Sequence, residues 1–253
     1  MNPAYREFEF DLPEALLARL IVVFEQLERG PLTKLGLEGV PDQQGVYQLF
    51  LDGQLVYIGK TDADAGLRRR LDRHAYKILH RKGLASHNVE YKAVRIYVFT
   101  AIDLEMQLIK HYSKTGGASW NKRGFGSNDP GRRRDKTEID PRNFDALYPI
   151  DLDRELEYAF DDCATAAQAA RMLKRVLPFN FRFSSETKKV AHEDLEAALI
   201  DLSGVPPTPR AILTAIVRSL PAGWQLTALR SHVILYKELV EDYPDPLLIV
   251  HSR

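Results

Sequence analysis

A chain of 253 residues has room for one large domain, or for a smaller domain with an accessory part, and its composition is that of a globular protein. Its 35 Lys and Arg balance its 35 Asp and Glu, so composition alone indicates no acidic partner. The single cysteine, Cys163, excludes an internal disulfide and a Cys-rich zinc site. No apolar run approaches the ~18 residues of a membrane span, and the N-terminus lacks the plan of a signal peptide. We therefore expect a cytoplasmic protein that does not enter a membrane.

The first half of the chain is expected to alternate helices and strands. Apolar residues at helical spacing predict a helix over 11–29, which Asp11 can cap and Gly30-Pro31 ends. The same reasoning predicts strands over 45–51, 54–59 and 89–99 and helices over 65–82 and 101–115. Residues 120–141 contain too many Gly, Pro, Asn and Asp for a regular element, so we expect a long basic loop there.

The second half is expected to form a mainly helical accessory domain of unknown role. The predicted elements are helices over 151–160, 164–176, 191–202, 209–220 and 226–240, and short strands over 179–183 and 247–250. The segment 165–177 resembles a helix-turn-helix element, although its many alanines favour a buried core helix. The predicted organisation is an N-terminal helical segment over 1–40, a domain over 41–141 and the accessory domain over 142–253.

Tyr47 and Tyr57 lie in two predicted strands that an Asp-Gly pair separates. A two-residue turn at Asp52-Gly53 would place the two tyrosines on opposite faces of the sheet. A three-residue loop over 51–53, with Gly53 in the left-handed conformation, would instead place them opposite each other on one face. A site that uses both tyrosines therefore requires the longer loop or an equivalent bulge.

Positive charge is concentrated in two segments, one in the helix predicted over 65–82 and one in the basic loop. The residues that could contact a phosphate backbone are Arg68, Arg69, Arg73, Lys77, Lys122, Arg123, Arg132, Arg133 and Arg134. The plain alternative for such residues is a solvated helix face and a solvated loop.

Four more polar residues follow the two tyrosines on the next predicted elements. Arg70 and His74 are four residues apart, so they share one face of a helix. Glu105 stands early in the next helix, and Asn121 follows Trp120 at the start of the basic loop. Each of these residues is ordinary by itself, and their order along the elements is what makes the set informative.

The set resembles the GIY-YIG nuclease superfamily. The name-giving tripeptides stand here as GVY at 45–47 and YIG at 57–59, the helix reads L-x-x-R-x-x-x-H over 67–74, and Glu105 and Asn121 match the late positions. The resemblance covers about residues 44–122. The later GFGSNDPGRRRD resembles the restriction-endonuclease branch of the superfamily and extends the match to about residue 136. No family resemblance is found for residues 150–253.

The resemblance implies an α+β fold in which helices flank a small central antiparallel three-stranded sheet. It also implies hydrolysis of DNA phosphodiesters with Mg²⁺ (or Mn²⁺) at Glu105, which is a hard oxygen ligand. The implied catalytic residues are Tyr47, Tyr57, Lys60, Arg70, His74, Glu105 and Asn121. Arg70 would hold fixed positive charge beside the phosphate, and Asn121 would orient a phosphate oxygen.

Two proton routes are open. Nearby cations would favour a Tyr47 phenolate, which would then deprotonate water, and alternatively His74 would accept the proton through Tyr47. Tyr57 would position the water or the phosphate, and the sequence does not separate the two routes.

The expected function is therefore a type II restriction endonuclease that acts on double-stranded DNA as a homodimer, since a palindromic site cut in both strands calls for two active sites. One alternative is a GIY-YIG nuclease of repair, mobile elements or phage defence without a short palindromic site. The other is a non-catalytic DNA-binding module, against which the complete residue set argues. The recognition sequence, the cut stagger and the role of residues 150–253 are not readable from the sequence.

Overall fold

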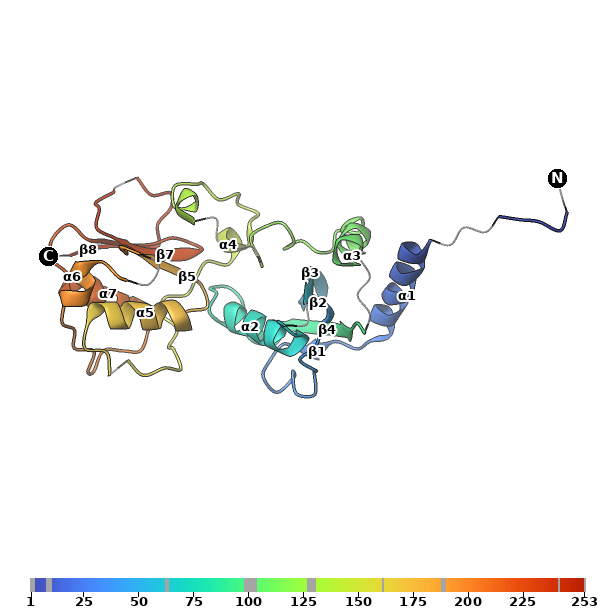
Figure 1. The fold of residues 1–253 in the computed structure, drawn as a ribbon, viewed down its shortest axis with the longest axis horizontal. Coiled ribbons are helices and arrows are strands. Elements are labelled where there is room, and N and C mark those ends of the chain that lie inside the picture. Colours follow the sequence, from blue (N-terminus) through green and yellow to red (C-terminus); the bar gives the residue numbers. More distant parts are fainter. Residues whose placement is uncertain are drawn as a thin grey trace. The chain divides into compact units, whose positions relative to one another are not determined.

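A computed structural model describes residues 3–7, 11–61, 64–97, 104–126, 131–160, 162–187, 190–240 and 242–252. The chain divides into two compact units (Figure 1). Unit 1 comprises Met1–Ala75 and Ala85–Asn121, and unit 2 comprises Tyr76–Leu84 and Lys122–Arg253. None of the helices in the described ranges combines the length and the apolarity that crossing a bilayer requires.

Unit 1 contains an antiparallel sheet in the order β1-β4-β2-β3. Its strands are β1 (Gly30–Pro31), β2 (Gly45–Leu51), β3 (Gln54–Thr61) and β4 (Val89–Arg95). Strand β2 has the predicted bounds, β3 runs two residues beyond the predicted range, and β4 ends at Arg95 although the prediction ran to residue 99. Residues 98–99 lie outside the described residues. The sheet has four strands rather than the expected three, because the two-residue β1 pairs with the outer side of β4.

The hairpin between β2 and β3 combines the two-residue turn with a bulge, which is one of the two arrangements that a site using both tyrosines requires. Leu51 pairs with Gln54, so the turn is the two residues Asp52 and Gly53, and both have positive φ values (48° and 79°). Further pairings are Phe50 with Leu55, Leu49 with Tyr57 and Tyr47 with Gly59, so Val56 is an extra residue on β3. This bulge restores the common face of the two tyrosines, which lie diagonally across the hairpin rather than opposite each other.

Helices cover both faces of this sheet (Figure 1). The helices are α1 (Leu12–Gln26), α2 (Leu67–Leu79) and α3 (Leu104–Ser113). Val46 and Ile58 pack with α1 and α3 in one buried cluster. On the other face, Gly45 lies so close to Leu67 of α2 that a Cβ atom at Gly45 would be 2.7 Å from the Leu67 side chain. The tyrosines of the hairpin therefore face α2.

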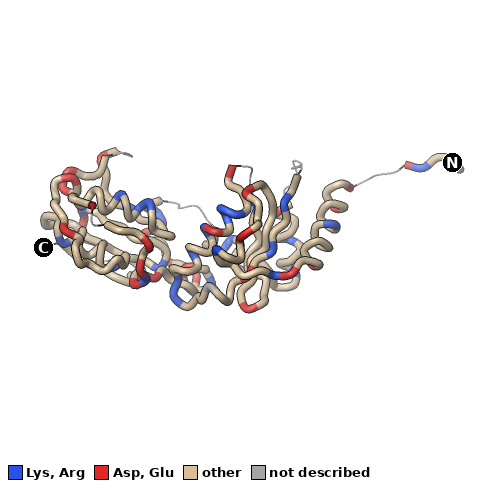
Figure 2. Tube along the Cα trace, turned by 90° about the horizontal axis from the view of Figure 1, so that it is seen from below, with Lys and Arg blue, Asp and Glu red and all other residues tan. Residues whose placement is uncertain are grey.

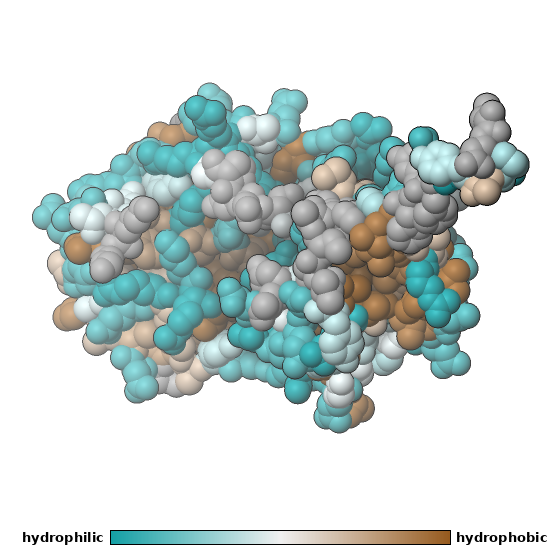
Figure 3. Space-filling model, turned by 45° about the vertical axis from the view of Figure 1, so that its right-hand side comes forward, coloured by the Kyte–Doolittle hydropathy of each residue, from teal (hydrophilic) through white to brown (hydrophobic). Residues whose placement is uncertain are grey.

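The three predicted helices of unit 1 are confirmed with shorter ends. The Asp11 side chain caps α1 by accepting a hydrogen bond from the Glu14 backbone N–H at 2.9 Å. Residues 101–103 of the helix predicted over 101–115 lie outside the described residues. Leu12, Val22 and Leu27 of α1 keep more than a third of their surface exposed, and Figure 3 shows apolar area on this side of unit 1.

Unit 2 is a mixed α+β structure and not the mainly helical domain that we expected. Its sheet has the order β5-β7-β6-β8, with β5 parallel to β7 and the other pairs antiparallel. The elements are β5 (Asn180–Phe183), β6 (Gln225–Ala228), β7 (His232–Tyr236), β8 (Leu248–His251), α4 (Phe144–Leu147), α5 (Ala166–Val176), α6 (Glu193–Ala197) and α7 (Pro209–Ser219). Short 3-10 turns span Ser86–Asn88 in unit 1 and Gly131–Arg134 in unit 2.

Three of the predicted helices were wrong in whole or in part, for identifiable reasons. Residues 151–160 form bends instead of a helix, although Leu152, Leu156 and Phe160 at four-residue spacing are buried in the core of unit 2. Residues 226–240 form the β6–β7 hairpin, in which β7 is buried on both faces and so lacks the alternation that marks a strand. Residues 191–202 contain only the short helix α6.

The remaining predictions for unit 2 are confirmed. Helix α5 begins with a capping box between Thr165 and Gln168, and its alanines are fully buried, as expected of a core helix. Helix α7 follows the predicted Thr208 cap, and strands β5 and β8 lie within one residue of their predicted ranges.

Candidate functional site

The two hairpin tyrosines form the centre of the candidate site. The ring centroids of Tyr47 and Tyr57 are 6.1 Å apart, with the ring planes tilted by 43°. Gly59 provides the space for Tyr47, because a Cβ atom at Gly59 would be 2.4 Å from the Tyr47 hydroxyl oxygen and 2.9 Å from the Tyr57 ring. The glycine of the YIG tripeptide is thus a packing requirement of this site.

Helix α2 brings the arginine and the histidine to these rings. Leu67 and Leu71 are buried against the sheet, which turns Arg70 and His74 toward the hairpin. The His74 Nε2 atom lies 2.8 Å from the Tyr47 hydroxyl oxygen, and Arg70 Nε donates to the same oxygen at 3.4 Å. The His74 ring centroid is 5.6 Å from the centroids of both tyrosine rings.

The direction of these hydrogen bonds follows from the chemistry of the groups. A guanidinium can only donate, so the Tyr47 oxygen accepts from Arg70. The Tyr47 hydroxyl donates to His74 Nε2 in the histidine tautomer that leaves this nitrogen without a proton. Tyr57 is also hydrogen-bonded to Tyr47 and to Arg70. The four side chains therefore form one connected hydrogen-bond network.

Burial determines the protonation state of the phenols. Tyr47 has no exposed surface and Tyr57 is 6% exposed. Burial raises the pKa of Tyr47, with a further increase from Tyr57 that the hydrogen bond from Arg70 only partly offsets. Burial, and then the charge of Glu105, raises the pKa of Tyr57. Arg70 favours the phenolate, as we expected, but burial outweighs it, so among the protein's own groups Tyr47 is a neutral phenol.

Arg70 keeps its charge in this setting. Burial alone would lower the pKa of the Arg70 guanidinium, but its hydrogen bond to Tyr47 and its interactions with both tyrosines raise it above the ordinary value. Arg70 thus supplies fixed positive charge beside two neutral phenols.

Glu105 and Lys60 form the more exposed part of the site. Glu105 stands in the first turn of α3, and its Oε2 atom is 3.8 Å from Lys60 Nζ, with side-chain exposures of 23% and 44%. A single partly buried carboxylate fits Mg²⁺ or Mn²⁺, because Mg²⁺ keeps several waters and takes one or two protein carboxylates. In the described part of the chain, three or more His, Cys, Asp or Glu side chains do not gather in any group that could hold a metal.

Both polar atoms of the Asn121 side chain bond to the backbone of β3. Its Oδ1 atom accepts from the Ile58 backbone N–H at 2.9 Å, and its Nδ2 atom donates to the Ile58 carbonyl at 2.8 Å. Together with the Trp120 N–H, which donates to Val56, these bonds cover the open edge of β3. Asn121 therefore fixes the backbone between Tyr57 and Gly59.

The basic residues of α2 divide into exposed and partly buried side chains. Arg68, Arg69 and Arg73 are exposed, and Arg69 forms an ion pair with Asp42. Lys77 is partly buried, and its Nζ atom lies 4.9 Å from the Phe125 ring centroid and 5.4 Å from that of Phe144. Lys77 thus packs inside unit 2, whereas the three arginines remain available to a phosphate backbone.

The basic loop is partly paired with acids of unit 2, and Figure 2 shows Lys and Arg interspersed with Asp and Glu in both units. Arg134 forms an ion pair with Asp145, which also accepts from the buried Arg81 at 2.7 Å. Arg132 is paired with Glu238, whereas Lys122, Arg123 and Arg133 are exposed. Residues 127–130 of this loop lie outside the described residues.

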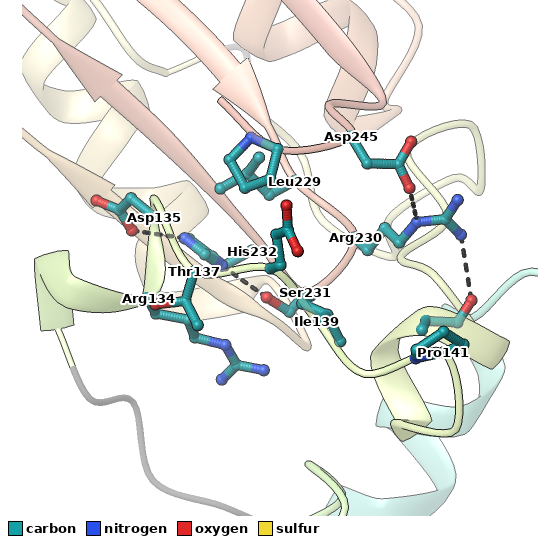
Figure 4. Close-up of a pocket in the computed structure, with 13 residues that line it drawn as sticks. Arg134, Asp135, Thr137, Ile139, Pro141, Leu229, Arg230, Ser231, His232 and Asp245 are labelled. Atoms are coloured by element: carbon teal, nitrogen blue, oxygen red, sulfur yellow. Dashed lines mark hydrogen bonds and ion pairs between the residues drawn. The ribbon is translucent and has the colours of Figure 1, made fainter. Parts of the chain in front are cut away.

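A second polar cluster of unit 2 was not predicted from the sequence. Asp135 is buried and accepts hydrogen bonds from Arg182 and from His232 Nε2, the latter at 2.8 Å (Figure 4). Ser231 Oγ lies 2.7 Å from the other ring nitrogen of His232, beside a cavity of about 460 Å³. Asp135 lay within a run of cations in the sequence, where a solvated acid is the ordinary expectation, so no sequence signal marked it as buried.

Comparisons with known protein families and with curated proteins found no match. The geometry of unit 1 is therefore what bears on function. Of the seven expected site residues, Tyr47, Tyr57, Arg70 and His74 form one hydrogen-bond network. Lys60 and Glu105 form a neighbouring pair that is coupled to the network through Tyr57, and Asn121 supports it from the edge of β3.

Proposed function

We propose that the protein is an endonuclease that hydrolyses phosphodiester bonds in double-stranded DNA, as a GIY-YIG nuclease of the type II restriction branch. The observation that carries the proposal is the network of Tyr47, Tyr57, Arg70 and His74 next to the carboxylate of Glu105. It combines a fixed cation, a proton acceptor and a hard metal ligand. These are the groups that attack of water on a phosphodiester needs.

The 2.8 Å contact between the Tyr47 hydroxyl oxygen and His74 Nε2 supports His74 as the proton acceptor. Tyr47 is fully buried, so it does not touch bulk water, and Tyr57 lies closer to the surface. A proton taken from water at Tyr57 would pass through Tyr47 to His74 Nε2 without a stable phenolate, which the raised pKa values of both phenols disfavour. In this scheme Tyr57 orients the water and takes its proton as it gives its own to Tyr47, and Tyr47 gives its own proton to His74 Nε2, so both phenols are relays.

The positive groups would act on the phosphate. Arg70 would stabilise the charge that develops on the phosphate oxygens, because it keeps its proton and is held in place by Tyr47. Lys60 would add charge from the end of β3. Glu105 would hold a Mg²⁺ ion. When bound, the ion would neutralise negative charge on the leaving 3′ oxygen and on a phosphate oxygen.

The proposal extends to the partners and the location. Duplex DNA carries the phosphate backbone that the exposed arginines of α2 would contact. A homodimer would supply one active site for each strand of a palindromic sequence. The protein would act in the cytoplasm.

The test is cleavage of a long duplex DNA of known sequence in the presence of Mg²⁺, followed by sequencing of the new ends. We expect discrete fragments whose ends share a short palindromic sequence, and no cleavage when EDTA replaces Mg²⁺. Nicks at branched or damaged sites would instead favour a repair or mobile-element nuclease. DNA binding without any cleavage would leave only the DNA-binding module.

A further inference from the structure

The segment Gly131–Arg134 is anchored to unit 2 by contacts of its last residue, Arg134, and of Asp135, which follows it. Arg134 pairs with Asp145, and Asp135 accepts from Arg182 and His232. Figure 4 shows Asp135 directed at the His232 ring while the Arg134 side chain extends away from it. The 3-10 turn that precedes Asp135 is therefore held rigidly, which reduces the entropy lost when its exposed side chains bind a ligand.

Arg132 projects from this turn onto an aromatic ring and a carboxylate. Its guanidinium carbon lies 4.3 Å from the Tyr236 ring centroid, and its Nη2 atom is 3.2 Å from both carboxylate oxygens of Glu238. Tyr236 donates to Asp135 Oδ2 at 3.5 Å, and Tyr243 donates to Glu238 Oε1 at 3.3 Å. The side chains of Arg132 and Glu238 are nevertheless 65% and 40% exposed.

We propose that Arg132, oriented by Tyr236 and Glu238, reads a guanine edge in the major groove of the DNA substrate. This inference rests on the proposed function, because it needs duplex DNA as the ligand. A guanidinium is planar, so its donors match the two acceptors O6 and N7 of guanine, and contact with an aromatic ring and a carboxylate restricts the orientation of the Arg132 side chain.

The charge of the pair favours a base over a phosphate. Glu238 neutralises Arg132, and its carboxylate would repel a phosphate that approached the same place. A base edge carries no net charge, so it can bond to the guanidinium without this repulsion, and the carboxylate can accept from a neighbouring cytosine amino group. Arg133, which is exposed and forms no ion pair within the described ranges, suits a phosphate contact.

The experiment compares sequence choice and salt dependence in full-length variants on the long duplex DNA used above. Arg132→Lys keeps the charge but loses the planar fork. We expect it to cut at sequences that differ from the wild-type site at one G·C pair, with discrimination at that pair reduced about 10- to 100-fold and with an unchanged salt dependence of binding. Arg133→Ala should instead weaken binding to all sequences equally and reduce the salt slope by about 1.

Two further variants control for folding and charge. Arg171→Ala removes an arginine of unit 2 that pairs with Glu196 at 2.6 Å, and it should leave the cut sites unchanged. Glu238→Gln leaves Arg132 unneutralised, so it should steepen the salt dependence of non-specific binding. Each variant is compared with wild type by thermal unfolding.

The outcomes separate the two proposals. Failure of the wild-type protein to cut DNA would contradict the proposed function. A wild-type protein that cuts specific sites, together with a folded Arg132→Lys variant that cuts the same sites with the same discrimination, would overturn the role of Arg132 alone. A uniform loss of binding in Arg132→Lys would also overturn it, because a phosphate contact has that signature.

Discussion

Unit 1 and unit 2 use their polar side chains in opposite ways. In unit 1, Tyr47, Tyr57, Arg70 and His74 bond to one another in a network of two phenols, a guanidinium and an imidazole. In unit 2, the buried cations are matched by acids, as in the pairing of Asp145 with both Arg81 and Arg134. A network of neutral phenols and a fixed cation is suited to chemistry, whereas matched buried ion pairs are suited to holding a segment in place.

The comparison shows that a run of Lys and Arg in a sequence does not tell whether those side chains are exposed to a ligand or paired with acids of the same protein. The cations of α2 and those of the basic loop looked equivalent before the structure was known. In the structure, Arg68 and Arg73 are exposed on α2, whereas Arg134 is enclosed by acids of its own unit. The following predictions test whether chemistry is confined to unit 1 and structural pairing to unit 2, beginning with the largest expected effect.

Replacement of Glu105 should remove cleavage altogether. Glu105→Ala takes away the carboxylate proposed to hold Mg²⁺, while the exposed arginines that would bind DNA are untouched, so binding should remain close to that of wild type. Single-turnover cleavage and a gel-shift titration measure the two properties. If Glu105→Ala cuts at a rate near that of wild type, the metal site has been assigned to the wrong residue.

Removal of the relay should reduce cleavage about 10²- to 10⁴-fold, which is the range for a positioned acid–base group. Tyr47→Phe deletes the hydroxyl that bonds to His74, and His74→Asn deletes the acceptor. Because the two groups act in one step, the double variant should be about as slow as each single variant. Rates measured at several pH values check this, and effects that multiply in the double variant would indicate two independent roles.

Breaking the buried ion pair of unit 2 should cost stability and not chemistry. Asp145→Ala leaves Arg81 buried without a carboxylate partner, so we expect a loss of about 3–5 kcal/mol in the free energy of unfolding. Urea unfolding measures the loss. Arg171→Ala is the matched control, because its pair with Glu196 is exposed and should contribute only about 0–1 kcal/mol. Equal losses in the two variants would contradict the structural role of Asp145.

Asn121→Ala should have a moderate effect on both properties. It leaves the N–H and C=O groups of Ile58 without their side-chain partner, at a cost of about 1–3 kcal/mol. The cleavage rate should fall less than in Tyr47→Phe, because Asn121 positions β3 and does not contact the phosphate. A larger fall in rate than that of Tyr47→Phe, with unchanged stability, would restore a direct role for Asn121.

Stability should fall at alkaline pH, and this effect is the smallest. Burial raises the pKa of Tyr76 and of Tyr243 to about 12, above the ordinary value near 10. A group whose pKa is raised on folding contributes stability that is present below pH 10 and is lost as pH rises toward 12. Urea midpoints between pH 8 and pH 11 should decrease, and the decrease should be smaller in Tyr76→Phe. An identical decrease in that variant would mean that Tyr76 ionises as freely as in the unfolded chain.

More of the secondary structure was predicted correctly from the sequence in unit 1 than in unit 2, for physical reasons. The strands of unit 1 are bounded by turn residues, and the spacing of Arg70 and His74 places both on one helix face. The sequence left a longer loop and a bulge as alternatives, and it did not place the bulge at Val56, because the register of a hairpin depends on packing on both faces. In unit 2, β7 is buried on both faces, so its sequence lacks the alternation of a strand. The four-residue spacing of Leu152 and Leu156 is the spacing expected of a helix, although these residues lie outside any helix.

The contacts of individual polar side chains were the least predictable feature. Asn121 and Asp135 both lie at the borders of the basic loop, yet one bonds to the backbone of β3 and the other accepts from Arg182 and His232. Partners that are distant in the sequence come together only through the tertiary fold, so local patterns carry no information about them.

The most direct test of the central claim is single-turnover cleavage of long duplex DNA in Mg²⁺ by the wild-type protein, by Arg70→Ala and by Arg171→Ala. The account predicts discrete fragments from the wild-type protein and from Arg171→Ala, and no fragments from Arg70→Ala even though that variant still binds the DNA. Cleavage by Arg70→Ala at the wild-type rate would contradict it.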